Sequence, residues 1–229
     1  LKIKPGDEFN QGWLESRVYS NKNGLDISSI YMDQGYLTFQ AIVSETSVVG
    51  DTVELEILLY EGKQFRVGDV TVVGDDKTND HVIYREIRTK PGDLFSRSNI
   101  VRTQRELSNL GYFAPEGFDV QIKQNESEGT VDLTYVVAER PSDQIQLSGG
   151  FGAGRIVGTL GLSFSNFSAR NMFKKDAWRP IPTGDGQKLS VQWQSNGIFF
   201  QSLIASSTEP WLRGKKATSF IPSYSRTRE

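Results

Sequence analysis

The sequence contains no cysteine and only one histidine, His81. The absence of cysteine excludes disulfide bonds and thiol catalysis within these residues. Zinc sites that need several cysteine or histidine ligands are nearly excluded as well. No apolar run reaches the ~18 residues that a membrane-spanning helix needs, although spanning strands carry a much weaker signal. The chain begins at Leu1 with neither a basic nor an apolar leader segment, so we expect it to be a fragment of a longer protein.

Side chains that carry enzyme chemistry are scarce as well. The glycines between Gly149 and Gly154 are not followed by the Lys-Ser/Thr of a phosphate loop, and His81 has no nucleophile in a recognisable elbow. Asp75-Asp76 precedes Lys77-Thr78, which is typical of a turn and a helix start rather than of a calcium loop. We therefore expect no catalytic residues, no metal site, no cofactor and no enzyme activity.

Charge is divided unevenly along the chain. Residues 1–140 hold 15 Lys and Arg against 23 Asp and Glu, a balance of −8, whereas residues 141–229 hold 11 against 5, a balance of +6. The change falls at the joint Glu139-Arg140-Pro141, where the proline lacks the N–H that would continue a strand. The acidic first part argues against nucleic-acid binding, even though Arg97, Arg102 and Arg105 form a basic cluster.

Two copies of one module occupy the residues before the joint. The matching segments, in order, are Lys4–Asp7 with Lys90–Asp93, Gln34–Tyr36 with Leu110–Tyr112, and Thr52–Leu55 with Thr130–Leu133. Because the order is kept through every pair, we interpret the segments as an internal repeat. The first copy carries about ten extra residues, which we place within Ser20–Asp26.

The second copy predicts the complete order β-α-α-β-β. We expect a strand at 65–73, helices at 80–88 and 96–110, and strands at 118–123 and 130–137. Thr78 or Asn79 would cap the first helix and Ser96 the second, whose apolar stripe is Ile100, Val101, Leu107 and Leu110. The first copy lacks the opening strand and helix, which would leave a sheet edge open, so we expect the protein to continue before Leu1.

From Ile145 onward, apolar and polar residues alternate with a period of two. We expect strands at 159–165, 188–194, 199–207 and 218–224, with a hairpin turn at Asn196-Gly197. A soluble sandwich and a transmembrane barrel both fit this alternation. Runs of about 9–11 residues, with aromatic and basic side chains gathered in the connections, favour the barrel. These interface residues are Phe173, Lys174, Lys175, Trp178, Trp211, Lys215 and Lys216.

The two copies resemble the POTRA repeats of outer-membrane assembly proteins, through their Gly-Tyr pairs, their Pro-Gly-Asp turns and Glu61-Gly62. Gly149–Gly152, Asn166-Phe167 and Glu209–Trp211 resemble the first barrel strands of insertases in that family. The resemblance implies α+β POTRA repeats followed by antiparallel β strands of an incomplete transmembrane β-barrel. The domains would be an incomplete repeat at 1–62, a complete repeat at 63–140 and barrel strands at 141–229. The connection 173–187 departs from the family because it is longer.

The same resemblance implies a function in the barrel assembly machinery, which folds β-barrel proteins and inserts them into the outer membrane. The POTRA repeats would lie in the periplasm. The partners would be unfolded outer-membrane proteins, accessory lipoproteins and outer-membrane lipid, and no nucleic acid. Two alternatives stay open, namely a two-partner secretion transporter of the same superfamily and a soluble β-rich interaction module.

Two strands are the candidate client-binding surfaces. The first barrel strand of the family closes a seam with the last, and glycines in it would weaken that seam because they supply no side-chain packing. The outer strand of a POTRA sheet would leave an edge to which a client strand can add. The seam residues are Ile145, Gln146, Leu147, Ser148, Gly149, Gly150, Phe151 and Gly152, and the POTRA edge residues are Phe118, Asp119, Val120, Gln121, Ile122 and Lys123.

Overall fold

The computed structural model describes residues 4–21, 23–152, 155–178, 181–196, 200–212 and 218–228. The chain divides into two compact units. The first comprises residues 1–73, 87–106 and 119–136, and the second comprises residues 74–86, 107–118 and 137–229. This division passes through the second repeat, so the domain limits inferred from the sequence stay a prediction.

The first repeat packs two helices on a hairpin. Helices α1 (Gln11–Val18) and α2 (Ile27–Asp33) begin where the side chains of Asn10 and Asp26 accept hydrogen bonds from the N–H groups of Trp13 and Ser29. Strands β1 (Gln40–Val49) and β2 (Thr52–Tyr60) pair antiparallel. The buried core between helices and hairpin consists of Leu14, Val18, Phe39 and Ala41.

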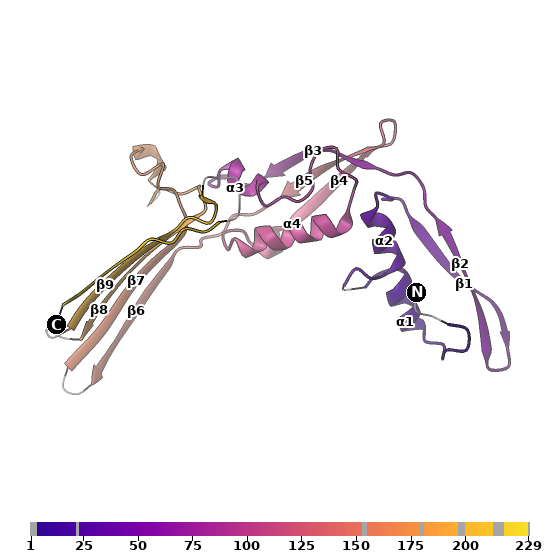
Figure 1. Cartoon of the computed structure of the whole chain (residues 1–229), viewed down its shortest axis with the longest axis horizontal. Helices are drawn as coiled ribbons and strands as arrows, with labels where there is room; N and C mark the ends of the chain where they lie inside the picture. The colour runs from indigo at the N-terminus through magenta and orange to yellow at the C-terminus, as the bar shows by residue number, and fades with distance from the viewer. Residues whose placement is uncertain are drawn as a thin grey trace. The chain divides into compact units, whose positions relative to one another are not determined.

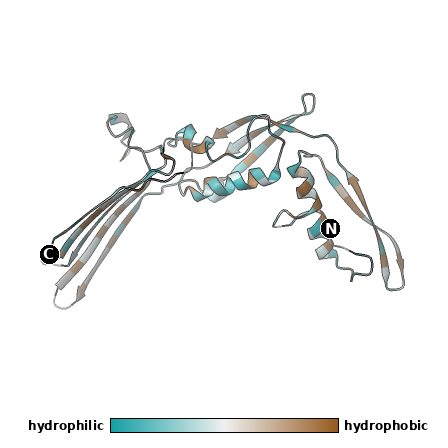
Figure 2. Ribbon diagram, in the orientation of Figure 1, coloured by the Kyte–Doolittle hydropathy of each residue, from teal (hydrophilic) through white to brown (hydrophobic). Residues whose placement is uncertain are grey.

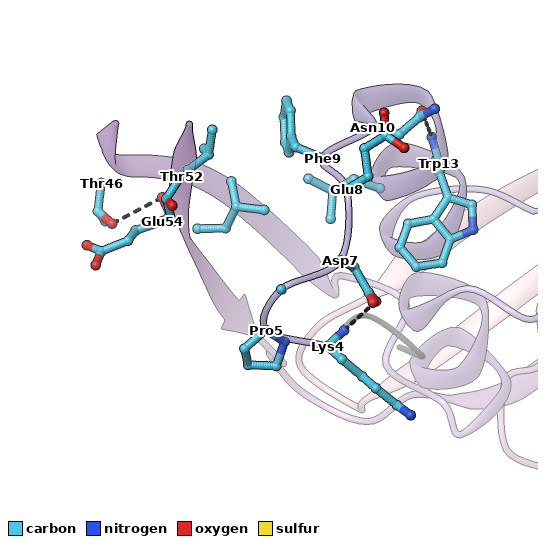
Figure 3. A pocket seen from close by; sticks show the side chains of 14 residues that line it. Lys4, Pro5, Asp7, Glu8, Phe9, Asn10, Trp13, Thr46, Thr52 and Glu54 are labelled. Carbon is cyan, nitrogen blue, oxygen red and sulfur yellow. Dashed lines mark hydrogen bonds between the residues drawn. The ribbon is translucent and has the colours of Figure 1, made fainter. Parts of the chain in front are cut away.

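A pocket of about 610 Å³ lies between the segment from Lys4 to Phe9 and strand β2 (Figure 3). In the second repeat, the equivalent residues 92–95 bond to strand β3 (Arg66–Val73), with Gly92 N at 2.8 Å from Val67 O. Strand β3 also pairs with β5 (Thr130–Val136), the counterpart of β2. The pocket therefore occupies the place that the opening strand takes in the second repeat, in agreement with the absence of that strand from the first copy.

The sheet of the second repeat has the order β3-β5-β4, where β4 spans Asp119–Asn125. Strand β3 runs parallel to β5, and β4 runs antiparallel to it. Along β5, Val131, Leu133 and Tyr135 are fully buried and alternate with partly exposed residues, as the period-two pattern predicts. Strand β4 pairs with β5 on one side and forms an edge of the sheet.

The helices of this repeat correct two expectations. Helix α3 (Asp80–Tyr84) is shorter than the expected 80–88, because Arg88 N donates to the Thr103 hydroxyl at 2.9 Å instead of continuing the helix. Helix α4 (Arg97–Asn109) begins after Ser96, whose hydroxyl accepts from Asn99 N at 3.2 Å. Val101 is 46% exposed, so its place in the apolar stripe was wrong. Thr103 is fully buried, which the sequence did not indicate.

The third sheet lies in the second unit and has the order β10-β9-β8-β7-β6. Its strands are β6 (Gln144–Gly152), β7 (Arg155–Phe167), β8 (Gln187–Asn196), β9 (Phe200–Thr208) and β10 (Ser223–Arg228). All neighbours pair antiparallel, and β8 and β9 form a hairpin up to Asn196 and Phe200, although Gly197 is outside the described residues. The fifth strand begins at Ser223 rather than at Thr218, because Pro222 has no N–H to donate.

The two faces of this sheet differ in polarity. Strand register places Ile145 beside Leu162 and Leu162 beside Val191, whereas Gln146 lies beside Gly161 and Gly161 beside Gln192. Figure 2 shows the resulting alternation along the strands. Ile145, Leu147 and Phe151 are 77%, 80% and 78% exposed. Within this unit the described strands form a single open layer, which fits part of a barrel and not a sandwich (Figure 1).

Helices long and apolar enough to cross a membrane are not found in the part of the chain that the structure describes.

We predict that Gly74→Ala destabilises the second repeat more than Gly92→Ala does. Both glycines have positive φ, 98° and 88°. A Cβ at Gly74 would overlap the Val137 carbonyl oxygen, whereas one at Gly92 meets nothing within 4 Å. We expect losses of about 2–4 and about 1 kcal/mol in the free energy of unfolding, measured through hydrogen-exchange protection of β5. Equal losses would contradict the overlap.

Candidate functional site

Strand β6, which contains the seam residues, is an edge strand of its sheet in the described part of the chain. It pairs with β7 from Gln144 with Ser163 to Gly152 with Arg155. The opposite edge of β6 therefore presents backbone N–H and C=O groups to a further strand.

Neither backbone conformation nor space requires the glycines in the middle of β6. Gly149 and Gly150 are absent from the positions with positive φ, which glycine alone adopts readily. A Cβ at Gly149 would meet only Val157 O, at an ordinary 3.7 Å, and one at Gly150 would meet nothing within 4 Å. Gly149 also lies opposite Gly158, so this cross-strand pair has no side chains to pack. The remaining effect of these glycines is to weaken the pairing of β6 with its neighbouring strands.

Strand β4 contains the POTRA edge residues from Asp119 to Lys123, and Phe118 immediately precedes it. Ile122 is exposed, as are the neighbouring Gln121 and Lys123. Among the described strands none lies on the outer side of β4, and the exposed Ile122 adds an apolar side chain there, which suits an added strand.

The joint is tied down rather than free. The Glu139 carboxylate accepts hydrogen bonds from Lys77 N and from Thr78 N, the latter at 2.8 Å. Arg140 N donates to Tyr112 O at 3.0 Å, and Arg140 Nε donates to Gly111 O at 3.2 Å. Hydrogen bonds of Glu139 and Arg140 therefore already hold the backbone of the joint in place. Pro141 is not the sole source of the joint's stiffness.

A cluster of five polar side chains, four of them buried, joins the loop before α3 to the connection between β7 and β8. Asn166 Nδ2 donates to Thr78 Oγ1 at 2.9 Å, and Asn79 Nδ2 donates to Asp185 Oδ1 at 2.8 Å. The Ser168 hydroxyl donates to the other Asp185 oxygen at 2.6 Å. We call these five residues, Thr78, Asn79, Asn166, Ser168 and Asp185, the polar cluster.

Main-chain bonds complete the polar cluster. Asn79 N donates to Gly184 O at 2.9 Å, and Gly186 N donates to Asn166 Oδ1 at 2.9 Å. Asn79 was expected as a possible helix cap, but its side chain bonds to Asp185 and makes no cap bond. His81, half exposed, lies with Nε2 at 3.6 Å from Asp185 Oδ1.

Close approach at Gly186 explains a glycine that the sequence analysis missed. Gly186 has φ 67°, and a Cβ there would lie 2.9 Å from the Tyr112 hydroxyl and 3.0 Å from Val82 Cγ1. Burial raises the pKa of Tyr112, whose hydroxyl has no hydrogen-bond partner among the described residues. The Thr183–Gly186 sequence looks like an ordinary turn, so only the tertiary contact distinguishes it.

Trp211, which was expected at a membrane interface, lies against two residues that follow α3. Trp211 Nε1 donates to Glu86 Oε1 at 2.8 Å, and the Arg85 guanidinium lies 5.5 Å from the centre of the indole ring. Lys215 and Lys216 lie outside the described residues.

The connection between β7 and β8 has a narrow base and an exposed end. Ser168 N donates to Pro182 O at 2.9 Å and Gly184 N donates to Asn166 O at 2.8 Å, and we call this short ladder of residues 166–168 and 182–184 the neck. Beyond the neck, residues 171–178, which we call the tip, include the short 3-10 helix η2 (Lys175–Ala177). Phe173, Lys174, Lys175 and Trp178 are all exposed there.

Residues 65–140 match the POTRA family, described as a surface antigen variable number repeat. Over 212 residues the chain is 28% identical to the outer membrane protein assembly factor BamA of Neorickettsia risticii, covering 91% of this chain and 27% of that protein. A putative outer membrane protein assembly factor of Treponema pallidum is also 28% identical, over 92% of this chain and 24% of its own length. The chain thus spans about a quarter of these relatives.

The fold matches a solved structure over nearly the whole chain. The crystal structure of BamA from Haemophilus ducreyi lacking POTRA domains 1–3 aligns with a TM-score of 0.77 at 20% identity, over 99% of this chain and 38% of that one. The match confirms the predicted fold class, a POTRA repeat followed by antiparallel strands of an incomplete barrel.

We predict that Asn166→Ala opens the polar cluster. The change removes a donor to buried Thr78 and the acceptor of Gly186 N, and each unpaired buried group costs energy. A loss of about 2 kcal/mol in local stability would speed amide exchange at Asn79 and Gly186 roughly thirtyfold. Asn125→Ala is the control, because Asn125 accepts from Ser127 on an exposed turn. Unchanged exchange in Asn166→Ala would show that the cluster does not hold the loop.

Proposed function

We propose that this chain, which is 28% identical to BamA of Neorickettsia risticii and matches the POTRA family at residues 65–140, is part of an outer-membrane insertase. The whole protein would fold β-barrel proteins and insert them into the outer membrane, without covalent chemistry. Clients would be unfolded outer-membrane proteins, and accessory lipoproteins of the assembly machinery would be its partners. The POTRA repeats would lie on the periplasmic side.

The observation that carries this proposal is the edge strand β6, whose Gly149 and Gly150 serve neither a turn nor a close contact. A barrel whose first strand is held weakly can release that strand and offer its backbone groups to a client strand. Each strand glycine weakens pairing by about 0.5–1 kcal/mol, so Gly149 and Gly150 together shift an opening equilibrium by roughly tenfold.

The uncovered apolar face of the sheet supports the membrane setting. Side chains such as Leu147 and Phe151 would cost solubility on a soluble sheet with no covering layer, whereas they are favourable against lipid. This feature argues against the soluble interaction module. The alternative function, a two-partner secretion transporter, is distinguished by the crosslinking experiment below.

The POTRA edge would act before insertion. A strand with one free side can accept any extended segment through backbone hydrogen bonds. Selection among clients can then rest on every second side chain of the added segment. Strand β4 meets this requirement with its free side and with exposed Ile122. We propose that β4 holds a client segment while β6 templates its first barrel strand.

We predict that Gly149→Thr with Gly150→Thr slows client insertion. Threonine favours strands and fits the free space at both positions, so seam pairing strengthens by about 1–2 kcal/mol while the barrel stays folded. Insertion of a model barrel protein into proteoliposomes should slow roughly tenfold. Gln192→Thr, in the interior strand β8, is the matched control. Insertion at the parental rate by a folded double variant would refute seam opening.

We predict client crosslinks along both edges. A photoreactive residue at Gln146 in β6 or at Gln121 in β4 should capture an unfolded outer-membrane protein during assembly, whereas one at Gln192 in the interior strand β8 should not. Capture of one dedicated secreted substrate, with no general client crosslinks, would favour the transporter instead.

A further inference from the structure

The tip of the β7–β8 connection presents apolar side chains together with basic ones. Phe173 is 92% exposed, Trp178 51% and Met172 41%. Lys174 and Lys175 stand between the aromatic residues and are exposed as well. Single exposed apolar residues are ordinary on protein surfaces, but three within one short, basic segment mark an interaction surface. None of them is used by the strand edges.

Hydrogen bonds within the connection fix the shape of the tip. Trp178 Nε1 donates to Met172 O at 3.0 Å, and Asn171 N donates to the Ser168 hydroxyl at 3.2 Å. Backbone bonds from Lys174 N to Asn171 O and from Ala177 N to Lys174 O close two turns. These hydrogen bonds hold the backbone of the tip in one shape with Phe173 exposed. Little conformational entropy would therefore be lost when the ring enters a lipid bilayer.

The base of the connection places the tip at the end of the membrane-facing sheet. The neck continues directly from β7 and leads into β8, whose Val191 lies beside Leu162 on the apolar face. Figure 1 shows the connection standing apart from the strands of the sheet. Aromatic and basic side chains next to the ends of spanning strands lie at the depth of lipid head groups.

Three aspartates near the tip, Asp75, Asp76 and Asp80, are the competing partner for its basic residues, and we call them the acidic wall. Arg170 and Lys174 line a hollow of about 700 Å³ with Asp75, Asp76 and Asp80. Burial raises the pKa of Asp75, and its acidic neighbours add to that effect. In the described residues, however, neither Arg170 nor Lys174 forms an ion pair with these carboxylates, so their charges stay available.

We propose that the tip is a membrane anchor that docks on an anionic bilayer surface, with Phe173 and Trp178 in the interface and Lys174 and Lys175 at lipid phosphates. The inference rests on the proposed function insofar as it needs the barrel in a membrane. Because the neck and the polar cluster connect the tip to Thr78 and Asn79, the anchor also holds the loop before α3 near that surface.

The test places a nitroxide label at Phe173 in the full-length protein, reconstituted in bilayers of phosphatidylethanolamine with phosphatidylglycerol. Phe173→Cys supplies the attachment point, with any cysteine elsewhere in the full protein replaced; this chain has none. The label should be accessible to oxygen and shielded from a water-soluble nickel complex. A label at Ser127, on an exposed turn of the second repeat, is the control and should remain accessible to nickel. A Phe173 label as accessible to nickel as the control would overturn the anchor.

Charge variants separate lipid from the acidic wall. Lys174→Gln with Lys175→Gln should lower bilayer partitioning of the label roughly twentyfold, and bilayers of phosphatidylcholine alone should do the same. Lys63→Gln, an exposed lysine between β2 and β3, is the control and should leave the partitioning of the label unchanged. If Asp75→Asn with Asp76→Asn moves the label while lipid composition does not, the acidic wall is the partner and the anchor is wrong. Client crosslinks at Gln146 in the same protein report on the insertase separately, so either proposal can fail alone.

Discussion

Unpaired backbone groups at strand edges are the constraint around which this chain is built. Every strand N–H and C=O needs a partner, and a buried group without one costs about 1–3 kcal/mol. The second repeat covers one side of β3 with residues 92–95, and the first repeat has a pocket where that strand would lie. In the described part of the chain, strands β4 and β6 each have a neighbouring strand on one side only. Proteins usually protect such edges, so the open sides of β4 and β6 point to strand addition as a working principle.

Buried polar contacts, rather than apolar packing, connect the loop before α3 to the strand connections. Apolar surfaces tolerate sliding, whereas hydrogen bonds with fixed donors and acceptors select one arrangement. Both carboxylate oxygens of Asp185 are bonded, and Asn166 uses its donor and its acceptor. The Glu139 carboxylate adds bonds to the same loop. The arrangement is therefore specified by a few directional contacts, each of which can be broken by one substitution.

Local patterns predicted local structure well, and long-range contacts decided the rest. The alternation in β5 and the Ser96 cap follow from neighbouring residues alone. Helix α3 ends early because Thr103 captures Arg88 N, which no pattern near residue 88 indicates. Asp185 is buried and Trp211 bonds to Glu86, 125 residues away, so a charged turn residue and an aromatic residue take roles that composition cannot reveal.

The neck gives the connection between β7 and β8 a property that its length alone does not suggest. Because residues 166–168 are bonded to residues 182–184, both ends of the intervening segment are held at a fixed separation. The entropy of closing the loop is set at the neck, and further residues would add little to it. Strand register in β7 and β8 is thereby insulated from what the segment contains. The segment beyond the neck can therefore change in length and in sequence during evolution without disturbing the sheet.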